Sequence, residues 1–140
     1  MIATIPSPSD PDEMGYADHM RFEPGDLALL DETEEVEIET ARPEGPVHRT
    51  IIWVVVDGDD VFVRSVNGAT ARWYREAVAD PAVAVHAAGR RLSARAAAAT
   101  DPSSVKRTSD ALIRKYSADP ALRLMLIPEI FDTTLRLTPG

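Results

Sequence analysis

The sequence contains no cysteine, so disulfide bridges, thiolate metal ligands and cysteine nucleophiles are all excluded. No hydrophobic run approaches the ~18 residues that a membrane-spanning helix needs, and the first residues lack the basic start and apolar core of a signal peptide. We therefore expect a cytoplasmic protein that does not act on membranes. The glycine motifs of Rossmann and P-loop proteins are missing too, which argues against dinucleotide or ATP binding by those routes.

Motifs for metal binding and for covalent hydrolysis are also absent. The three histidines lie far apart in the sequence, and the acidic group at residues 57–60 lacks the ligand spacing of a calcium loop. No G-x-S-x-G segment marks a nucleophilic serine. We expect no dedicated metal site, and the sequence singles out no catalytic side chain.

The chain is long enough for one compact domain, and its charge is unevenly distributed. It has 140 residues, of which 44% are hydrophobic and 27% charged, as in ordinary globular proteins. Residues 1–41 carry twelve acidic side chains and one basic side chain, Arg21, whereas the remainder is slightly basic. Because no dense cluster of Lys and Arg occurs, we expect no nucleic-acid partner. Thirteen of the fifteen basic residues are arginine, which suits either bidentate anion binding or simply a GC-rich genome.

The pattern of prolines and acids divides the chain into a tail and a domain. Residues 1–21 are rich in proline and acidic residues and contain few apolar ones. We therefore predict a flexible acidic segment there and a folded domain over 22–140. Within the domain, period-2 alternation and β-branched runs predict about six strands, joined mostly by short turns. The predicted strands cover residues 36–40, 50–56, 61–66, 82–87, 90–95 and 133–138. This order favours a small antiparallel barrel.

Turn and cap signals predict the connections between these strands. Asp57-Gly58 predicts a type I′ hairpin turn between strands 50–56 and 61–66, the first of which is expected to be covered on both faces. One helix is predicted to begin at Pro24, and a second is predicted over residues 69–79. A third is predicted to begin at Pro102, with Asp101 as its N-cap. In the last helix, an apolar stripe is expected at Val105, Leu112, Ile113 and Tyr116.

The junction between the strand ending near Val66 and the helix after Ala69 has the composition of an anion site. Arg64, Ser65, Thr70 and Arg72 surround it, and free N–H groups at a helix start attract negative charge. The predicted hairpin would bring Arg49 to the same rim. An equally supported interpretation is that these arginines only pair with surface carboxylates.

Several segments together resemble an uncharacterised bacterial family, domain of unknown function 2255. The resemblance covers about residues 22–139 and rests on 49–55, 61–65, Gly68, 72–75, Pro81, 85–86, 89–90, 110–111, 115–116 and 133–137. The Arg-Thr strand start, the Ser-x-x-Gly loop and the Trp-Tyr helix are also similar to deazaflavin-dependent nitroreductases. In place of the Gly-Arg-x-Ser/Thr-Gly segment of those enzymes, this chain has residues 42–48.

The resemblance implies a mainly β protein with short helices, folded as a split antiparallel β-barrel of the FMN-binding type. It also implies a homodimer that binds FMN or a deazaflavin coenzyme and carries out hydride transfer. Carried over residue by residue, the cofactor-binding positions are Arg49, Thr50, Ile51, Trp53, Arg64, Ser65, Gly68, Arg72 and Trp73. The alternative is a dimeric module of the same fold that binds some other small ligand, or takes part in an interaction, without a cofactor.

Overall fold

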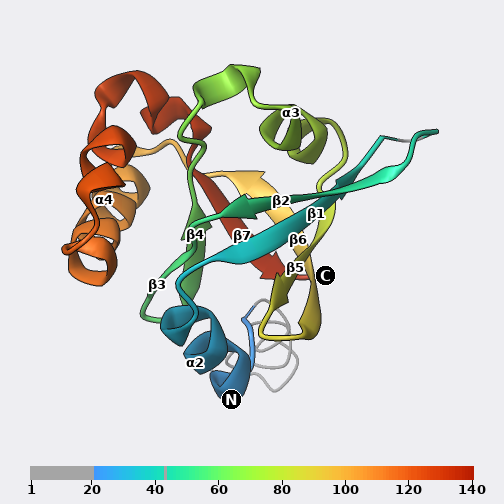
Figure 1. The fold of residues 1–140 in the computed structure, drawn as a ribbon, viewed down its shortest axis with the longest axis horizontal. Coiled ribbons are helices and arrows are strands. Elements are labelled where there is room, and N and C mark those ends of the chain that lie inside the picture. Colours follow the sequence, from blue (N-terminus) through green and yellow to red (C-terminus); the bar gives the residue numbers. More distant parts are fainter. Residues whose placement is uncertain (1–20, 43) are drawn as a thin grey trace, which may run out of the picture.

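A computed structural model of the chain describes residues 21–42 and 44–140. The predicted flexible segment 1–21 therefore lies outside the described residues, apart from Arg21. One antiparallel sheet organises the domain, in the order β2-β1-β5-β6-β7-β4-β3. Its strands are β1 (Val36–Ala41), β2 (Val47–Ile52), β3 (Val55–Asp57), β4 (Asp60–Val63), β5 (Ala82–Ala87), β6 (Arg90–Ala98) and β7 (Leu135–Pro139). Figure 1 shows the sheet strongly curled, with helices at its ends.

The connection between β2 and β3 forces this sheet to close into a barrel. These strands form its two opposite edges, yet only Trp53 and Val54 separate them in the chain. Three residue steps span at most ~11 Å, so the end of β2 at Ile52 and the start of β3 at Val55 must lie close together. The barrel closes at this point, which we call the seam (Trp53–Val54), without hydrogen-bonded pairing of β2 to β3. The predicted split antiparallel β-barrel is confirmed.

The predicted strand over residues 50–56 is wrong as a single element. Ile52 and Val55 pack into different hydrophobic clusters, so one continuous apolar run serves two strands that part at the seam. β2 pairs with β1, and only β3 forms the predicted hairpin with β4. β2 is an edge strand with Ile51 62% exposed, so it is not covered on both faces. A two-residue turn is present with Gly58 at a φ of +62°, but Asp59 lacks the positive φ of the predicted type I′ turn.

In the described part of the chain, three α-helices and three 3-10 helices accompany the sheet. They are α2 (Pro24–Glu32), α3 (Arg72–Ala79), α4 (Pro102–Tyr116), η1 (Gly68–Thr70), η2 (Pro120–Leu126) and η3 (Pro128–Thr133). The predicted cap is confirmed, because the Asp101 carboxylate accepts the Ser104 N–H at 3.0 Å. The predicted stripe on α4 is correct at Leu112 and Tyr116 but wrong at Ile113, which is 46% exposed. Among the described helices, none combines the length and apolar character needed to cross a bilayer.

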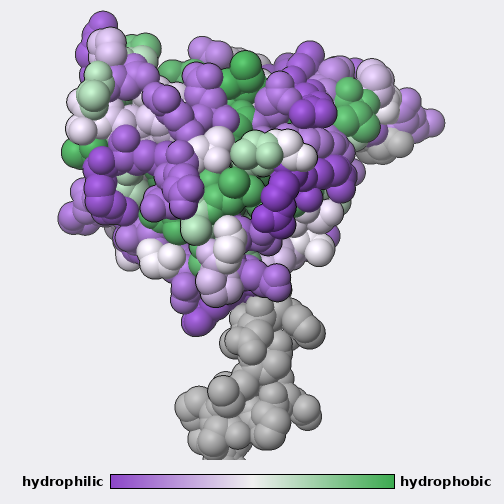
Figure 2. All heavy atoms as spheres, turned by 60° about the horizontal axis from the view of Figure 1, so that its bottom comes forward, coloured by the Kyte–Doolittle hydropathy of each residue, from purple (hydrophilic) through white to green (hydrophobic). Residues whose placement is uncertain are grey.

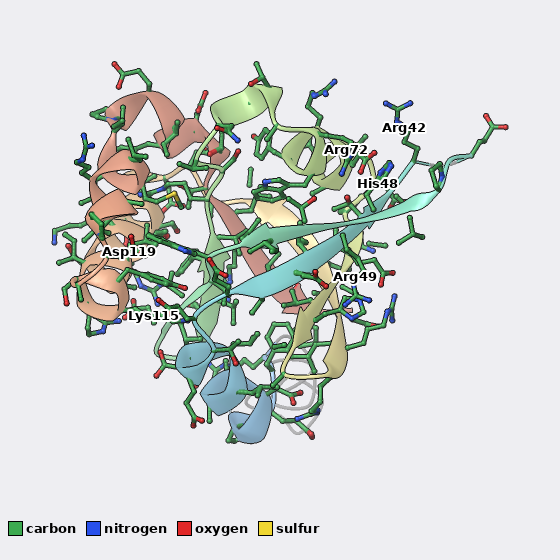
Figure 3. All side chains as sticks on the ribbon, viewed as in Figure 1. Arg42, His48, Arg49, Arg72, Lys115 and Asp119 are labelled. Atoms are coloured by element: carbon green, nitrogen blue, oxygen red, sulfur yellow. The ribbon has the colours of Figure 1, made fainter. Side chains whose placement is uncertain are left out.

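The end of α4 holds the seam in place. The Lys115 ammonium donates to three backbone carbonyls, those of Leu30, Thr33 and Val54, at 2.9, 2.8 and 2.7 Å (Figure 3). Burial lowers the pKa of Lys115 to about 8. The Tyr116 hydroxyl donates to the Glu34 carbonyl at 2.6 Å and contacts Val54. We call Lys115 and Tyr116 the clamp, because they tie α4, α2 and the seam together.

The face turned forward in Figure 2 is mostly hydrophilic, with hydrophobic residues gathered in patches near its centre. This view brings forward the end of the molecule at the bottom of Figure 1, where α2 lies. The apolar side chains of the domain are instead concentrated in two buried clusters. The main cluster fills the barrel, and the second lies between β3–β4, α4 and the 3-10 helices.

The clamp generates a stability prediction. We expect Lys115→Met to lower the free energy of unfolding by about 2 kcal/mol, because three carbonyls lose a charged donor. Lys106→Met is the matched control on the same helix, since Lys106 pairs only with exposed Asp110 and should leave stability nearly unchanged. Urea unfolding of both variants checks this. Equal midpoints for the two would show that the Lys115 ammonium adds nothing to the stability of the fold.

Candidate functional site

A cavity of about 420 Å³ lies beside the seam, between β2, the η1–α3 segment and η2. This volume is in the range of small-molecule sites. Its walls are largely apolar and aromatic, with Trp53, Trp73, Leu124 and Met125 contributing to them. We call this cavity the central pocket. It contains a few polar groups, which decide what kind of ligand fits.

Two indole rings line the central pocket from opposite parts of the fold. Trp53, at the seam, stacks on Tyr116 with ring centroids 4.0 Å apart and an interplanar angle of 5°. Trp73 comes from α3 and is 6% exposed, with Tyr74 packed edge-on at 6.2 Å. Because the clamp residue Tyr116 fixes the plane of Trp53, the pocket has a flat, rigid aromatic wall.

Arg64 is a buried cation at the pocket, only 2% exposed. Its guanidinium donates to Thr134 Oγ1 at 2.9 Å, to Ser109 Oγ and the Met125 carbonyl at 3.0 Å each, and to the Val105 carbonyl at 3.1 Å. All four acceptors are neutral, and within the described residues no carboxylate pairs with it. Burial therefore lowers the pKa of Arg64 to about 10. The guanidinium also lies over the Phe131 ring, 4.6 Å from its centroid, and since it has five N–H groups, one donor remains.

Thr50 supplies an unsatisfied polar atom. Its Oγ1 is buried and has no hydrogen-bond partner, and it is the one such side-chain atom found in the described part of the chain. Thr50 also lines the central pocket. A buried hydroxyl without a partner costs free energy, so this atom marks a place where a ligand group would be favoured.

The structure brings five of the nine predicted cofactor-binding residues to the central pocket: Thr50, Ile51, Trp53, Arg64 and Trp73. It does not bring Arg49 there. Because β2 pairs with β1 and not with β4, Arg49 lies on the outer side of that pair and forms an ion pair with Glu37 at 2.6 Å. The expected approach of Arg49 to the rim at Arg64 is therefore wrong.

Of the remaining predicted residues, Ser65 and Gly68 belong to the loop before α3, and Arg72 is the first residue of that helix. The Ser65 hydroxyl donates to the Gly68 carbonyl at 2.8 Å, and Thr70 donates to the Asn67 carbonyl at 3.0 Å, so both hydroxyls bond within the loop. Gly68 has a φ of +71°, which this loop requires and which favours glycine. Arg72 lies apart from these residues, at a second and smaller pocket.

This second pocket, of about 160 Å³, was not predicted. Arg42, Arg72 and Arg75 line it together with Glu76, and we call it the arginine pocket. Glu76 is 5% exposed and accepts hydrogen bonds from Thr40 at 2.7 Å and from His48 Nδ1 at 3.1 Å. Although burial opposes ionisation, the Thr40 and His48 hydrogen bonds lower the pKa of Glu76.

No group of three or more His, Asp or Glu side chains lies close enough to hold a metal ion within residues 21–42 and 44–140. Carboxylates do reach the central pocket, at Glu35 and Asp119. Asp119 also accepts the Ala121 N–H at 2.8 Å, which fixes its orientation. These two acids make their part of the pocket unfavourable for a phosphate.

Comparisons with known proteins agree with this architecture. A family model described as "Uncharacterized protein conserved in bacteria (DUF2255)" matches residues 26–137. No curated protein matches the sequence. Among solved structures, the heme storage protein HutZ of Vibrio cholerae has a TM-score of 0.59 at 17% identity, covering 86% of this chain and 92% of that one.

Two further structures show the same fold at similarly low identity. A conserved hypothetical protein of Mycobacterium tuberculosis, Rv2991, has a TM-score of 0.62 at 12% identity and covers 87% of this chain and 82% of its own. An F420 reductase has a TM-score of 0.51 at 19% identity, and the match covers 81% of this chain and 91% of the reductase chain. These likenesses establish the split-barrel fold, and they identify no ligand for this chain.

Because the Thr50 hydroxyl has no hydrogen-bond partner, we expect Thr→Val substitutions at Thr50 and at Thr133 to change the free energy of unfolding in opposite directions. Thr50→Val should raise the free energy of unfolding of the ligand-free protein by about 1 kcal/mol, because it removes a buried group that has no partner. Thr133→Val should lower it by about 1–2 kcal/mol, because Thr133 Oγ1 accepts the Ser65 N–H and donates to the Ile130 carbonyl. Chemical denaturation measures both. A destabilised Thr50→Val protein would show that Thr50 Oγ1 already has a partner.

Proposed function

This chain belongs to the bacterial family DUF2255, and we propose that it is a cytoplasmic homodimer that binds FMN or a deazaflavin coenzyme in its central pocket. The observation that carries this proposal is the combination of flat indole walls with an unpartnered Thr50 hydroxyl and a spare Arg64 N–H. A planar heteroaromatic ring with polar edges satisfies all three. The predicted cofactor residues at this pocket are those that supply these groups.

The side chains present fit a flavin-type ring better than they fit a heme. A flavin ring offers carbonyl and ring-nitrogen acceptors at its edge, to which Arg64 and Thr50 can donate. Heme iron is usually held by His, Cys, Met or Tyr, and Met125 alone among these types lines the central pocket. The F420 reductase among the structural neighbours carries a deazaflavin coenzyme in its name, which is consistent with this choice.

The chain's own residues would orient the ring and exclude water from one of its faces. Trp53 is held flat by Tyr116, and Trp73 is fixed in the barrel core, so neither wall needs to move on binding. A flavin supplies hydride transfer when it is bound, and the protein supplies anchoring and orientation. Oxidoreductase activity is therefore the proposed role of the bound state.

A second copy of the chain would cover the apolar rim of the central pocket. Ile51, Val66 and Leu124 line the pocket and remain 62%, 46% and 40% exposed. They lie beside β2, whose outer edge has no partner strand in the described chain. Exposed apolar side chains around a site, next to an unpaired edge, favour association.

We expect wild-type protein to sediment as a dimer at micromolar concentration, and Ile51→Lys to shift it toward monomer. Val78→Lys is the control, because Val78 is 59% exposed but lies on α3 away from the central pocket lining. Sedimentation velocity distinguishes these outcomes. A monomeric wild type, or equal behaviour of both variants, would contradict the proposed dimer.

The ligand is tested by the visible spectrum of the purified protein and by fluorescence titration with FMN and with the deazaflavin coenzyme. We expect saturable binding of at least one of them at micromolar concentration or tighter. Thr50→Val should weaken that binding about fivefold while stabilising the free protein, since the lost hydrogen bond contributes only in the complex. Failure of both ligands to bind a folded protein would favour the alternative, a module that binds another small ligand without a cofactor.

A further inference from the structure

The arginine pocket carries more positive charge than its surroundings neutralise. Arg42 follows β1, while Arg72 and Arg75 belong to α3, and all three line one cavity. Figure 3 shows Arg42, Arg72 and His48 gathered where α3 meets the β1–β2 ribbon. Within the described residues, Arg72 and Arg75 form no ion pair, and Arg42 reaches Glu76 only at 3.6 Å.

Glu76 is the single carboxylate lining the arginine pocket in the described chain, and it is already engaged. Thr40 and His48 donate to it from two paired strands, since Thr40 and His48 are opposite each other in the β1–β2 register. With His48 neutral, three guanidinium groups therefore face one carboxylate. A net charge of about +2 in a small cavity is unfavourable unless an anion or solvent compensates it.

His48 places a titratable group at this cluster. Its Nδ1 lies 3.1 Å from the Glu76 carboxylate, and the side chain is 24% exposed. In the neutral ring Nδ1–H donates to Glu76 and Nε2 is free to accept a proton. The charged groups facing it are Glu76, Arg42 and Arg72. Protonation of His48 raises the local charge from about +2 to about +3.

We propose that the arginine pocket binds a tetrahedral dianion, a sulfate or a phosphate group, and that protonation of His48 strengthens this binding. Arg72 and Arg75 supply the uncompensated donors, and Arg42 closes the cavity from the β1 side. Glu76 holds His48 in place and does not itself contact the anion. The site does not depend on the proposed flavin, because its residues are separate from those of the central pocket.

The test is calorimetric titration of the full-length, cofactor-free protein with sodium sulfate at constant ionic strength. Sulfate remains a dianion across the whole range, so any change in affinity between about pH 5.5 and about pH 8 comes from the protein. We expect saturable binding that is about fivefold to tenfold tighter at the lower pH, as one added charge near a dianion predicts. Binding should be lost in Arg72→Ala/Arg75→Ala and unchanged in Arg95→Ala, an exposed arginine on β6.

His48→Gln separates the proton effect from the arginines. Glutamine can still donate to Glu76 but does not titrate, so this variant should bind sulfate with nearly the same affinity at both pH values. Thermal unfolding confirms that each variant is folded, and His48→Asn serves in its place if it is not. The proposal is overturned by absence of saturable binding, by equal binding in Arg95→Ala and Arg72→Ala/Arg75→Ala, or by a pH dependence that persists without His48.

A competition experiment identifies the source of the dianion. If the phosphate end of the proposed flavin occupies the arginine pocket, sulfate competes with FMN but not with riboflavin, which lacks the phosphate. If the site holds a free anion, sulfate and FMN bind together. Sulfate binding in a protein that binds no flavin would contradict the proposed function and leave the arginine pocket established.

Discussion

The two-residue seam between β2 and β3 is the constraint on which the rest of the structure depends. It joins opposite edges of one sheet, so the sheet has no flat alternative and must curl until the end of β2 meets the start of β3. Edge strands that meet without pairing leave backbone groups in need of partners. The clamp supplies them here, because the Lys115 ammonium donates to the Val54 carbonyl and the Tyr116 hydroxyl accepts the Val54 N–H. The central pocket lies beside this point, and the seam residue Trp53 is part of its lining.

The same seam connects the stability of the barrel with the geometry of the central pocket. Tyr116 bonds to the seam backbone and also stacks on Trp53, so one residue serves both purposes. Arg64 also serves both purposes. It bonds to α4, to η2 and to Thr134 just before β7, and it lines the pocket. Loss of either would therefore alter the fold and the pocket together. The Thr50 hydroxyl differs, because nothing in the described fold depends on it.

Elements whose ends are marked by nearby turn or cap residues were predictable from the sequence, and elements that depend on contacts distant in the chain were not. The β5–β6 hairpin and the start of α4 follow from residues within a few positions of each other, and the structure has both. The break at Trp53 has no local signal in the sequence. A continuous apolar run has the same pattern whether its residues pack into one hydrophobic cluster or, as here, into two. Arg64 was predicted as a cofactor residue from its motif. Its buried network involves Ser109 and Thr134, 45 and 70 positions away, which no spacing indicates. The link between Glu76 and His48, 28 positions apart, was invisible for the same reason.

The position of β7 in the sheet has a consequence for synthesis of the chain. In the strand order, β7 alone stands between the group β2-β1-β5-β6 and the pair β4-β3. It is also the last of the described strands in chain order. While these residues are still inside the ribosome, the emerging chain holds two partial sheets with unpaired inner edges. The barrel is therefore completed only after β7 has left the ribosome, and until then the nascent chain exposes surfaces that chaperones bind.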